Sequence, residues 1–79
     1  MASVTISLYE AEKNKTFQVS SAPNIKLLES LGLRIGTMVT ILNRYTFDGP
    51  VLLRVEDTYS LAIGKDIATQ IGVKEVAVS

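Results

Sequence analysis

The sequence predicts one small β-rich barrel with two short helices, formed by residues 1–79 as a single domain. Several short stretches alternate apolar and polar residues with a period of two, whereas only two stretches have helical spacing. Turn-forming residues separate these stretches, and no repeat or linker divides the chain. Apolar residues make up 47% of the chain, which is enough for one compact core. Closure into a barrel is expected, because an open sheet of this size exposes unpaired edges.

The first predicted strand follows a turn at residues 13–15. Asn14 suits this turn because asparagine tolerates a left-handed backbone. Residues 16–19 then alternate, with Phe17 and Val19 on one face. This pattern predicts a half-buried strand.

Residues 25–31 are predicted to form the first helix. Their three leucines fall within an arc of about 100° and the polar residues lie opposite. Asn24 is expected to cap the helix and Gly32 to end it. Two helical turns do not hold together alone in water, so the leucines are expected to dock on the sheet. The apolar set is Leu27, Leu28 and Leu31, and the polar set is Lys26, Glu29 and Ser30.

The middle of the chain predicts a meander of three strands with alternating patterns. The first two strands are separated by a loop that ends in Asp48-Gly49-Pro50, and the last two by a tight turn at Glu56-Asp57. The predicted strands are residues 37–42, 51–56 and 58–63.

Helical spacing returns over residues 65–71, and Gly72 is expected to end this second helix. Residues 73–78 then alternate, with Val76 and Val78 on one side of a final strand. This late strand and an early one are expected to wrap onto the meander and cover its edges.

The composition excludes several classes of function. The chain has no Cys and no His, which excludes disulfide scaffolds, zinc fingers, thiolate nucleophiles and Ser-His-Asp relays, so no enzyme activity is expected. The formal net charge is zero, which argues against nucleic acid as a partner, although Arg34, Arg44 and Arg54 could flank aromatic residues. No apolar run approaches the roughly 20 residues that span a bilayer, so membrane contact is expected only through a partner.

No metal site and no cofactor are expected. Only Glu56 and Asp57 are adjacent among the carboxylates, and they fall in a predicted solvated turn. The glycine pair Gly32 and Gly36 matches neither nucleotide-binding motif. The side chains that could ligate a hard ion are Glu10, Glu12, Glu29, Asp48, Glu56, Asp57, Asp66 and Glu75.

Two surfaces are candidates for binding a protein partner. The loop between the first two meander strands carries Arg44, Tyr45 and Phe47, and Arg and Tyr are enriched in binding hot spots. The same loop also fits an arrangement in which one aromatic packs over the barrel end and the other is incidental surface. The polar face of the first helix, with Lys26 and Glu29, is the second candidate, although its residues are more typical of an ordinary solvated face.

A set of residues in order along the chain carries a family resemblance: Leu28, Leu31, Gly32, Leu33, Gly36, Val39, Gly49, Pro50, Leu61, Ala62, Ile63 and Gly72. It resembles FeoA, the ferrous iron transport protein A of bacteria, whose signature is L-x-x-L-G-L-x-P-G-x-x-V, then a G-P hairpin and an I-A-L strand. The resemblance runs from about Leu8 to about Val76. Three residues depart from the family pattern: Asn14 replaces Gly, Ile35 replaces Pro, and Gly64 replaces a common Arg.

The resemblance implies an SH3-like β-barrel with a helical insertion and a cytosolic, accessory role in ferrous iron uptake. The implied partner is ferrous iron transport protein B, a membrane permease with a cytosolic GTPase domain. The family also resembles the C-terminal domain of iron-dependent repressors, so a stand-alone domain that binds and senses a transition metal ion is the alternative. A homo-oligomer is compatible with exposed sheet edges and zero net charge.

Overall fold

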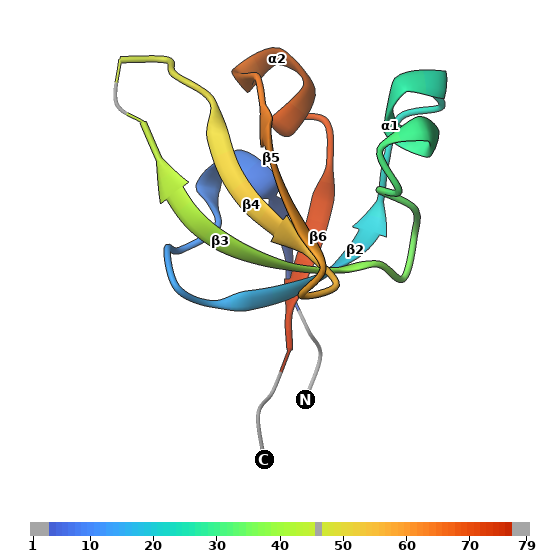
Figure 1. The fold of residues 1–79 in the computed structure, drawn as a ribbon, viewed down its shortest axis with the longest axis horizontal. Helices are drawn as coiled ribbons and strands as arrows, with labels where there is room; N and C mark the ends of the chain where they lie inside the picture. The colour runs from blue at the N-terminus through green and yellow to red at the C-terminus, as the bar shows by residue number, and fades with distance from the viewer. Residues whose placement is uncertain (1–3, 46, 77–79) are drawn as a thin grey trace.

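The computed structural model describes residues 4–45 and 47–76; Thr46 of the candidate loop and Val78 of the predicted final strand lie outside the described residues. The described chain forms a six-stranded antiparallel sheet with two short α-helices, which confirms the predicted mainly β fold (Figure 1). The elements are β1 (Thr5–Ser7), the 3₁₀ turn η1 (Leu8–Glu10), β2 (Thr16–Ser21), α1 (Lys26–Ser30), β3 (Met38–Arg44), β4 (Val51–Val55), β5 (Tyr59–Ile63), α2 (Lys65–Ala68) and β6 (Gly72–Glu75).

The predicted meander is present, and the late strand joins it where expected. The strand order is β1-β6-β2-β3-β4-β5, with every neighbouring pair antiparallel. The strands curve around a common interior, with α1, α2 and the β3–β4 loop at one end (Figure 1). This end carries both of the predicted binding surfaces.

The sheet curls as a barrel does, but its hydrogen-bonded ladder does not close within the described residues. β6 covers the β2 edge of the meander, as expected for a terminal strand. The opposite edge, on β5, has β4 as its only strand neighbour in the ladder. β1 is too short to continue around to β5, because after three residues the chain turns into η1. The expected full closure is therefore wrong for the β5 edge.

The core is formed by the side chains that alternation places on the inner face of the sheet. β2, β3 and β4 each contribute residues that are almost completely buried, as their sequence patterns predict. Residues of η1, α1 and α2 complete the core at the ends of the sheet. The buried strand residues are Phe17, Val19, Val39, Ile41, Val51, Leu53, Val55, Ile63 and Val73.

The first helix buries fewer leucines than predicted. Leu28 is 2% exposed, whereas Leu27 is 52% exposed. The helix has only five residues, so Leu31 falls at its C-terminal cap, where it is half-buried. Leu33, which follows the helix, is 2% exposed and takes the second buried position. A helix this short presents one residue to the core rather than a stripe.

The helix also begins without the predicted cap. Ile25, and not Asn24, is the N-cap residue, and it makes no side-chain capping hydrogen bond. The Leu28 amide donates instead to the Ile25 carbonyl oxygen at 3.1 Å. The capping role expected for Asn24 is therefore wrong.

The two predicted helix-stop glycines have different roles. Gly32 has φ of 81°, the left-handed value expected of a residue that ends a helix. Gly72 is instead the first residue of β6 and is buried between β1 and β2. A Cβ at position 72 would collide with the side chains of Ser21 and Thr5 on the flanking strands. Gly72 is therefore required by close strand packing and not by a helix end.

Candidate partner-binding surface

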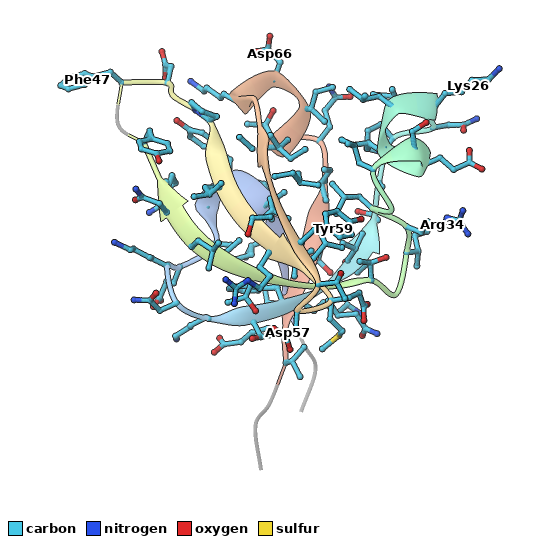
Figure 2. All side chains as sticks on the ribbon, in the orientation of Figure 1. Lys26, Arg34, Phe47, Asp57, Tyr59 and Asp66 are labelled. Carbon is cyan, nitrogen blue, oxygen red and sulfur yellow. The ribbon has the colours of Figure 1, made fainter. Side chains whose placement is uncertain are left out.

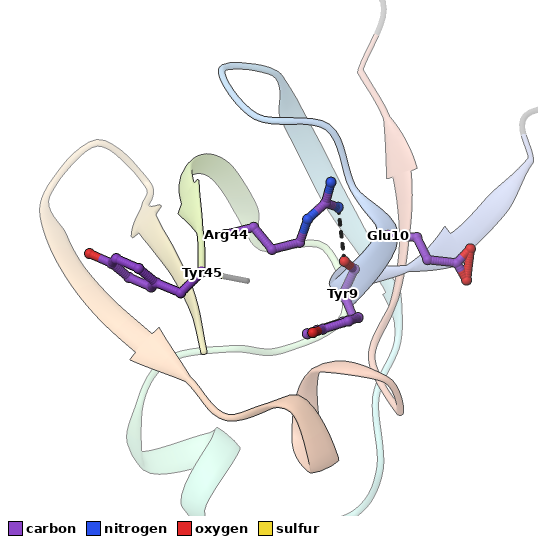
Figure 3. Close-up of a pocket in the computed structure, with 4 residues that line it drawn as sticks. All are labelled: Tyr9, Glu10, Arg44 and Tyr45. Carbon is purple, nitrogen blue, oxygen red and sulfur yellow. Dashed lines mark hydrogen bonds between the residues drawn. The ribbon is translucent and has the colours of Figure 1, made fainter. Parts of the chain in front are cut away.

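Arg44 fixes the base of the candidate loop. It is the last residue of β3, and its Nη1 donates to the carbonyl oxygens of Tyr9 at 2.9 Å and Ala11 at 3.0 Å. These bonds join the end of β3 to η1 and to the residue that follows it, more than 30 residues earlier in the chain, and Figure 3 shows the bond to Tyr9. They also satisfy two carbonyls at the end of a 3₁₀ turn, which has few internal partners.

A groove lies beside this arginine. Tyr9, Glu10, Arg44 and Tyr45 line a volume of about 390 Å³. Figure 3 shows the Tyr45 and Tyr9 side chains on two sides of the open space, with the Glu10 carboxylate directed away. Tyr9 does not stand out in the sequence, because the 3₁₀ turn that positions it has no periodic signal.

The tip of the loop presents a fully exposed aromatic side chain. Phe47 is 99% exposed, and Tyr45 is also exposed, so neither aromatic packs into the core. Phe47 and Asp48 have φ of 57° and 63°, respectively. Bulky residues rarely adopt this left-handed conformation. The Tyr45 amide closes the loop by donating to the Pro50 carbonyl oxygen at 3.1 Å.

Lys65, the first residue of α2, connects three separate segments at this end. Its Nζ lies 2.6 Å from Asp48 Oδ1 in the loop and 5.5 Å from the ring centroid of Tyr9 in η1. The hydrogen bond and the charge of Asp48 raise the pKa of Lys65 above its ordinary value of 10.5. The ammonium therefore holds the loop against α2 and η1 at neutral pH. Nothing in the local sequence pattern indicated this role for Lys65.

The second candidate surface is formed by the exposed face of α1. Lys26, Glu29 and Ser30 line a hollow of about 420 Å³ together with Arg34, which follows the helix. Within the part of the chain that the structure describes, Lys26 and Arg34 form no ion pair. The helical spacing of residues 25–31 gives no sign that Arg34 lies beside this helix face.

The structure does not bring the two candidate surfaces into one site. Phe47 and Lys26 lie on opposite sides of the molecule at the same end, with Asp66 of α2 between them (Figure 2). We call the groove lined by Tyr9, Glu10, Arg44 and Tyr45, together with Phe47 at the loop tip, the loop surface. We call the face formed by Lys26, Glu29, Ser30 and Arg34 the helix surface. A partner that contacts both must extend across α2.

The remaining predicted motif residues build the scaffold beneath these surfaces. The Tyr59 hydroxyl donates to the Leu31 carbonyl oxygen and so ties β5 to the end of α1. Gly36 has φ of 98° in the turn before β3. Gly49 is half-buried and Pro50 is exposed beside the loop, while Ala62 is exposed on β5. These residues shape turns and an edge and carry no reactive groups.

Several of the acidic side chains are engaged in local contacts. Glu12 and Glu75 each lie 3.3 Å from the Lys15 ammonium, and their hydrogen bonds raise the pKa of that lysine. Glu56 accepts a hydrogen bond from the Met38 amide at 2.8 Å. Among the described residues, no three His, Cys, Asp or Glu side chains gather in an arrangement that could hold a metal ion.

The described helices α1 and α2, with five and four residues, do not have the length of an apolar segment that crosses a membrane.

Comparison with known proteins yields one family. The FeoA domain family matches residues 6–75 of this chain. A search of curated proteins found no match.

Solved structures resemble the chain over nearly its whole length. A crystal structure of an iron uptake regulatory protein (FeoA) is 26% identical, covers 92% of this chain and 99% of its own, and has a TM-score of 0.82. A FeoA-like protein from Clostridium acetobutylicum is also 26% identical, covers 100% of this chain and 94% of its own, and has a TM-score of 0.80.

A manganese-dependent transcriptional repressor shares the fold at 16% identity, with a TM-score of 0.84. The match covers 96% of this chain but 44% of the repressor. The domain fold thus occurs both as nearly a whole chain and as part of a larger one. These neighbours agree with the SH3-like β-barrel that the resemblance to FeoA implies.

Proposed function

Because this chain belongs to the FeoA domain family, whose match takes in residues 6–75, and therefore to a family of iron uptake, we propose that it acts as an accessory protein of bacterial ferrous iron uptake. It works in the cytoplasm by binding ferrous iron transport protein B, the membrane permease with a cytosolic GTPase domain. Ferrous iron is the cargo of that partner. The chain itself contributes a binding surface.

One observation carries this proposal. The similarity to the iron uptake regulatory protein extends over 92% of this chain and 99% of the other, at a TM-score of 0.82. The likeness therefore concerns two domains of matching extent and not a shared fragment. A regulatory role exercised through contact fits a domain of this size better than conduction of an ion.

The loop surface supports binding as the mode of action. Phe47 leaves a large aromatic ring in water, and Tyr45 and Arg44 lie close to it in the chain. Tyr and Arg are enriched in binding hot spots, and Phe is enriched in the cores of protein interfaces. The loop base is fixed by Arg44 and by the Asp48–Lys65 pair, so binding orders little additional chain.

Contact alone is sufficient to regulate a permease that exchanges between two states. If the chain binds one state more tightly by about 1–3 kcal/mol, it shifts the equilibrium about 5–150-fold. Coupling is reciprocal, so if bound nucleotide shifts the same equilibrium of the permease, it also changes the affinity of the chain. Affinity that depends on nucleotide is thus the expected signature.

The test is binding of the full chain to purified permease in lipid nanodiscs, loaded with GDP or with a non-hydrolysable GTP analogue. Phe47→Asn removes the aromatic ring and suits the left-handed backbone, and we expect it to weaken binding at least about tenfold. Val4→Asn is the matched control, because Val4 is also a strongly exposed apolar residue but precedes β1 rather than lying in the loop. Its affinity should equal that of the unmodified chain.

Absence of binding to the permease in every nucleotide state would contradict the proposal. A calorimetric titration of the chain alone with ferrous iron, under anaerobic conditions, separates it from the metal-sensing alternative. The proposal expects no tight stoichiometric uptake. Uptake of one ion per chain at micromolar concentration would favour the alternative.

A further inference from the structure

β5 carries a sheet edge whose hydrogen-bonding groups can be assigned from its neighbour β4. The Glu56 amide, just after β4, donates to the Met38 carbonyl oxygen on β3 at 2.9 Å. The Val55 carbonyl oxygen accepts from the Thr58 amide on the β5 side at 2.9 Å. Backbone groups alternate sides along a strand, so the odd-numbered residues of β4 face β5.

The register then fixes which residues of β5 face away from the sheet. Tyr59, Leu61 and Ile63 stand opposite Val55, Leu53 and Val51 and are the residues that bond to β4. Ser60 and Ala62 therefore direct their N–H and C=O groups to the free edge. Both residues are exposed, and neither has another backbone hydrogen-bond partner in the described chain.

This edge lacks charged side chains, proline and a bulge, three of the features that protect sheet edges against pairing. Natural sheet edges carry charged side chains, proline or a bulge that discourages another strand from adding. The five residues of β5 include no charged residue and no proline, and the β4–β5 register has no irregularity. The edge is thus a short, regular and uncharged strand.

We propose that a second copy of this chain pairs with the β5 edge, antiparallel, across a two-fold axis between Leu61 and the partner's Leu61. In this register Ser60 stands opposite the partner's Ala62, and Ala62 opposite the partner's Ser60. Each pair exchanges two hydrogen bonds, so all four free backbone groups of each edge are satisfied.

The register shifted toward the β4–β5 turn satisfies fewer groups. If Ser60 faces the partner's Ser60, Ala62 must face the partner's Thr58. The amide of Thr58 already donates to the Val55 carbonyl oxygen and cannot serve the partner. The two-fold register at Leu61 is therefore the one in which β5 complements itself.

The side chains favour the same occupant. Across this axis Leu61 meets its own copy, which is an apolar cross-strand pair, whereas Tyr59 stands opposite the partner's Ile63, whose side chain is already buried in its own core. Leu61 is half-buried and Tyr59 is 44% exposed, so both have apolar surface left to bury. The strand is uncharged and the chain has zero net charge, so two copies do not repel each other.

The test is sedimentation equilibrium of the full chain from about 10 µM to about 1 mM, with Ala62→Pro as the diagnostic variant. Proline removes an edge amide that the monomer does not use, so the β4–β5 ladder remains intact. Loss of two of the four bonds across the axis is expected to raise the dimer dissociation constant at least about tenfold. Ser60→Thr keeps both edge groups and is the matched control, with an unchanged constant.

Amide hydrogen exchange by NMR gives a site-specific measurement that does not depend on a variant. Association through this edge slows exchange at Ser60 and Ala62 as the concentration rises, more than at Leu27 on the exposed side of α1. A chain that stays monomeric to 1 mM, or a dimer that Ala62→Pro leaves unchanged, overturns the proposal. Protection of Ser60 and Ala62 only on adding the permease would also overturn it, and would assign the edge to a foreign strand.

Discussion

Phe47 combines two features that each have a cost for an isolated domain. It leaves a whole aromatic ring in water and holds a left-handed backbone that a bulky side chain disfavours. Residues in such conformations persist where the surroundings enforce them, and here the loop base is fixed on both sides. Strain together with exposure is the reason why the proposed partner contact is centred on Phe47.

Gly32 and Gly36 allow backbone strain to be separated from steric collision. Both have a left-handed φ, but a Cβ at Gly32 would strike the Tyr59 hydroxyl, whereas a Cβ at Gly36 meets open space. We expect Gly36→Ala to lower the free energy of unfolding by about 1–2 kcal/mol, from strain alone. Gly32→Ala should cost about 1–3 kcal/mol more. Urea denaturation of both variants measures the difference.

Tyr59→Phe provides the check on this explanation. Removing the hydroxyl removes the collision, so Gly32→Ala should become nearly as mild as Gly36→Ala in that background. Equal losses for the two glycine variants in the native background would contradict the collision at Gly32.

The first helix shows how few contacts hold an element of this size. With five residues and no side-chain cap, α1 has little stability of its own. Its docking depends on Leu28 from within the helix and on Leu33 after it. The Tyr59 hydroxyl adds a hydrogen bond to its C-terminal end through the Leu31 carbonyl oxygen.

Leu27 and Leu28 offer a matched pair of substitutions at adjacent positions. Leu28→Ala removes a buried side chain and is expected to lower the free energy of unfolding by about 2–5 kcal/mol. Leu27→Ala changes an exposed position and should stay within about 0.5 kcal/mol. Both are measured by thermal and urea unfolding followed by circular dichroism. Similar losses at the two positions would contradict the burial of Leu28 alone.

The elements were predictable where local pattern determines them. Alternation located β2 to β5, because a strand with one buried face shows its period directly in the sequence. Asn14, with φ of 68°, has the left-handed backbone that its residue type suggested. The role of Gly72 was missed, because its reason lies in contacts with Ser21 and Thr5, far away in the sequence.

The candidate site was predictable only in part for the same reason. The loop residues Arg44, Tyr45 and Phe47 are close in sequence and could be proposed together. Tyr9 and Lys65 reach the same surface from η1 and α2, and no local pattern reports such contacts. The unpaired β5 edge is likewise a property of strand order, which depends on the whole sheet.

The end of the molecule that carries the loop surface is assembled from three distant parts of the chain. Asp48 from the β3–β4 loop, Lys65 from α2 and Tyr9 from η1 meet there. Since both members of the ion pair are exposed, its strength must fall as salt is added. The arrangement depends on the charge of Lys65 and should therefore respond to pH.

The raised pKa of Lys65 determines the direction of that response. The lysine pKa is higher in the folded chain than its ordinary 10.5, so the stabilising contact is fully present below pH 10.5 and is lost as pH rises through the folded value. We expect the Lys65 Cε resonance to titrate above 10.5 in the native chain, and nearer to 10.5 in Asp48→Asn. Unchanged titration in that variant would contradict the assignment of Asp48 as the cause.

β1 and β6 run side by side in opposite directions, with Thr5 opposite Lys74. The point where the described chain enters the sheet is therefore next to the point where it leaves, away from the loop and helix surfaces (Figure 1). A fold with adjacent entry and exit can be grafted into or onto a longer polypeptide without disturbing its far end. This geometry therefore suits insertion of the domain into another protein. It also favours circular permutants in which the chain is joined beside Thr5 and Lys74 and opened at another position.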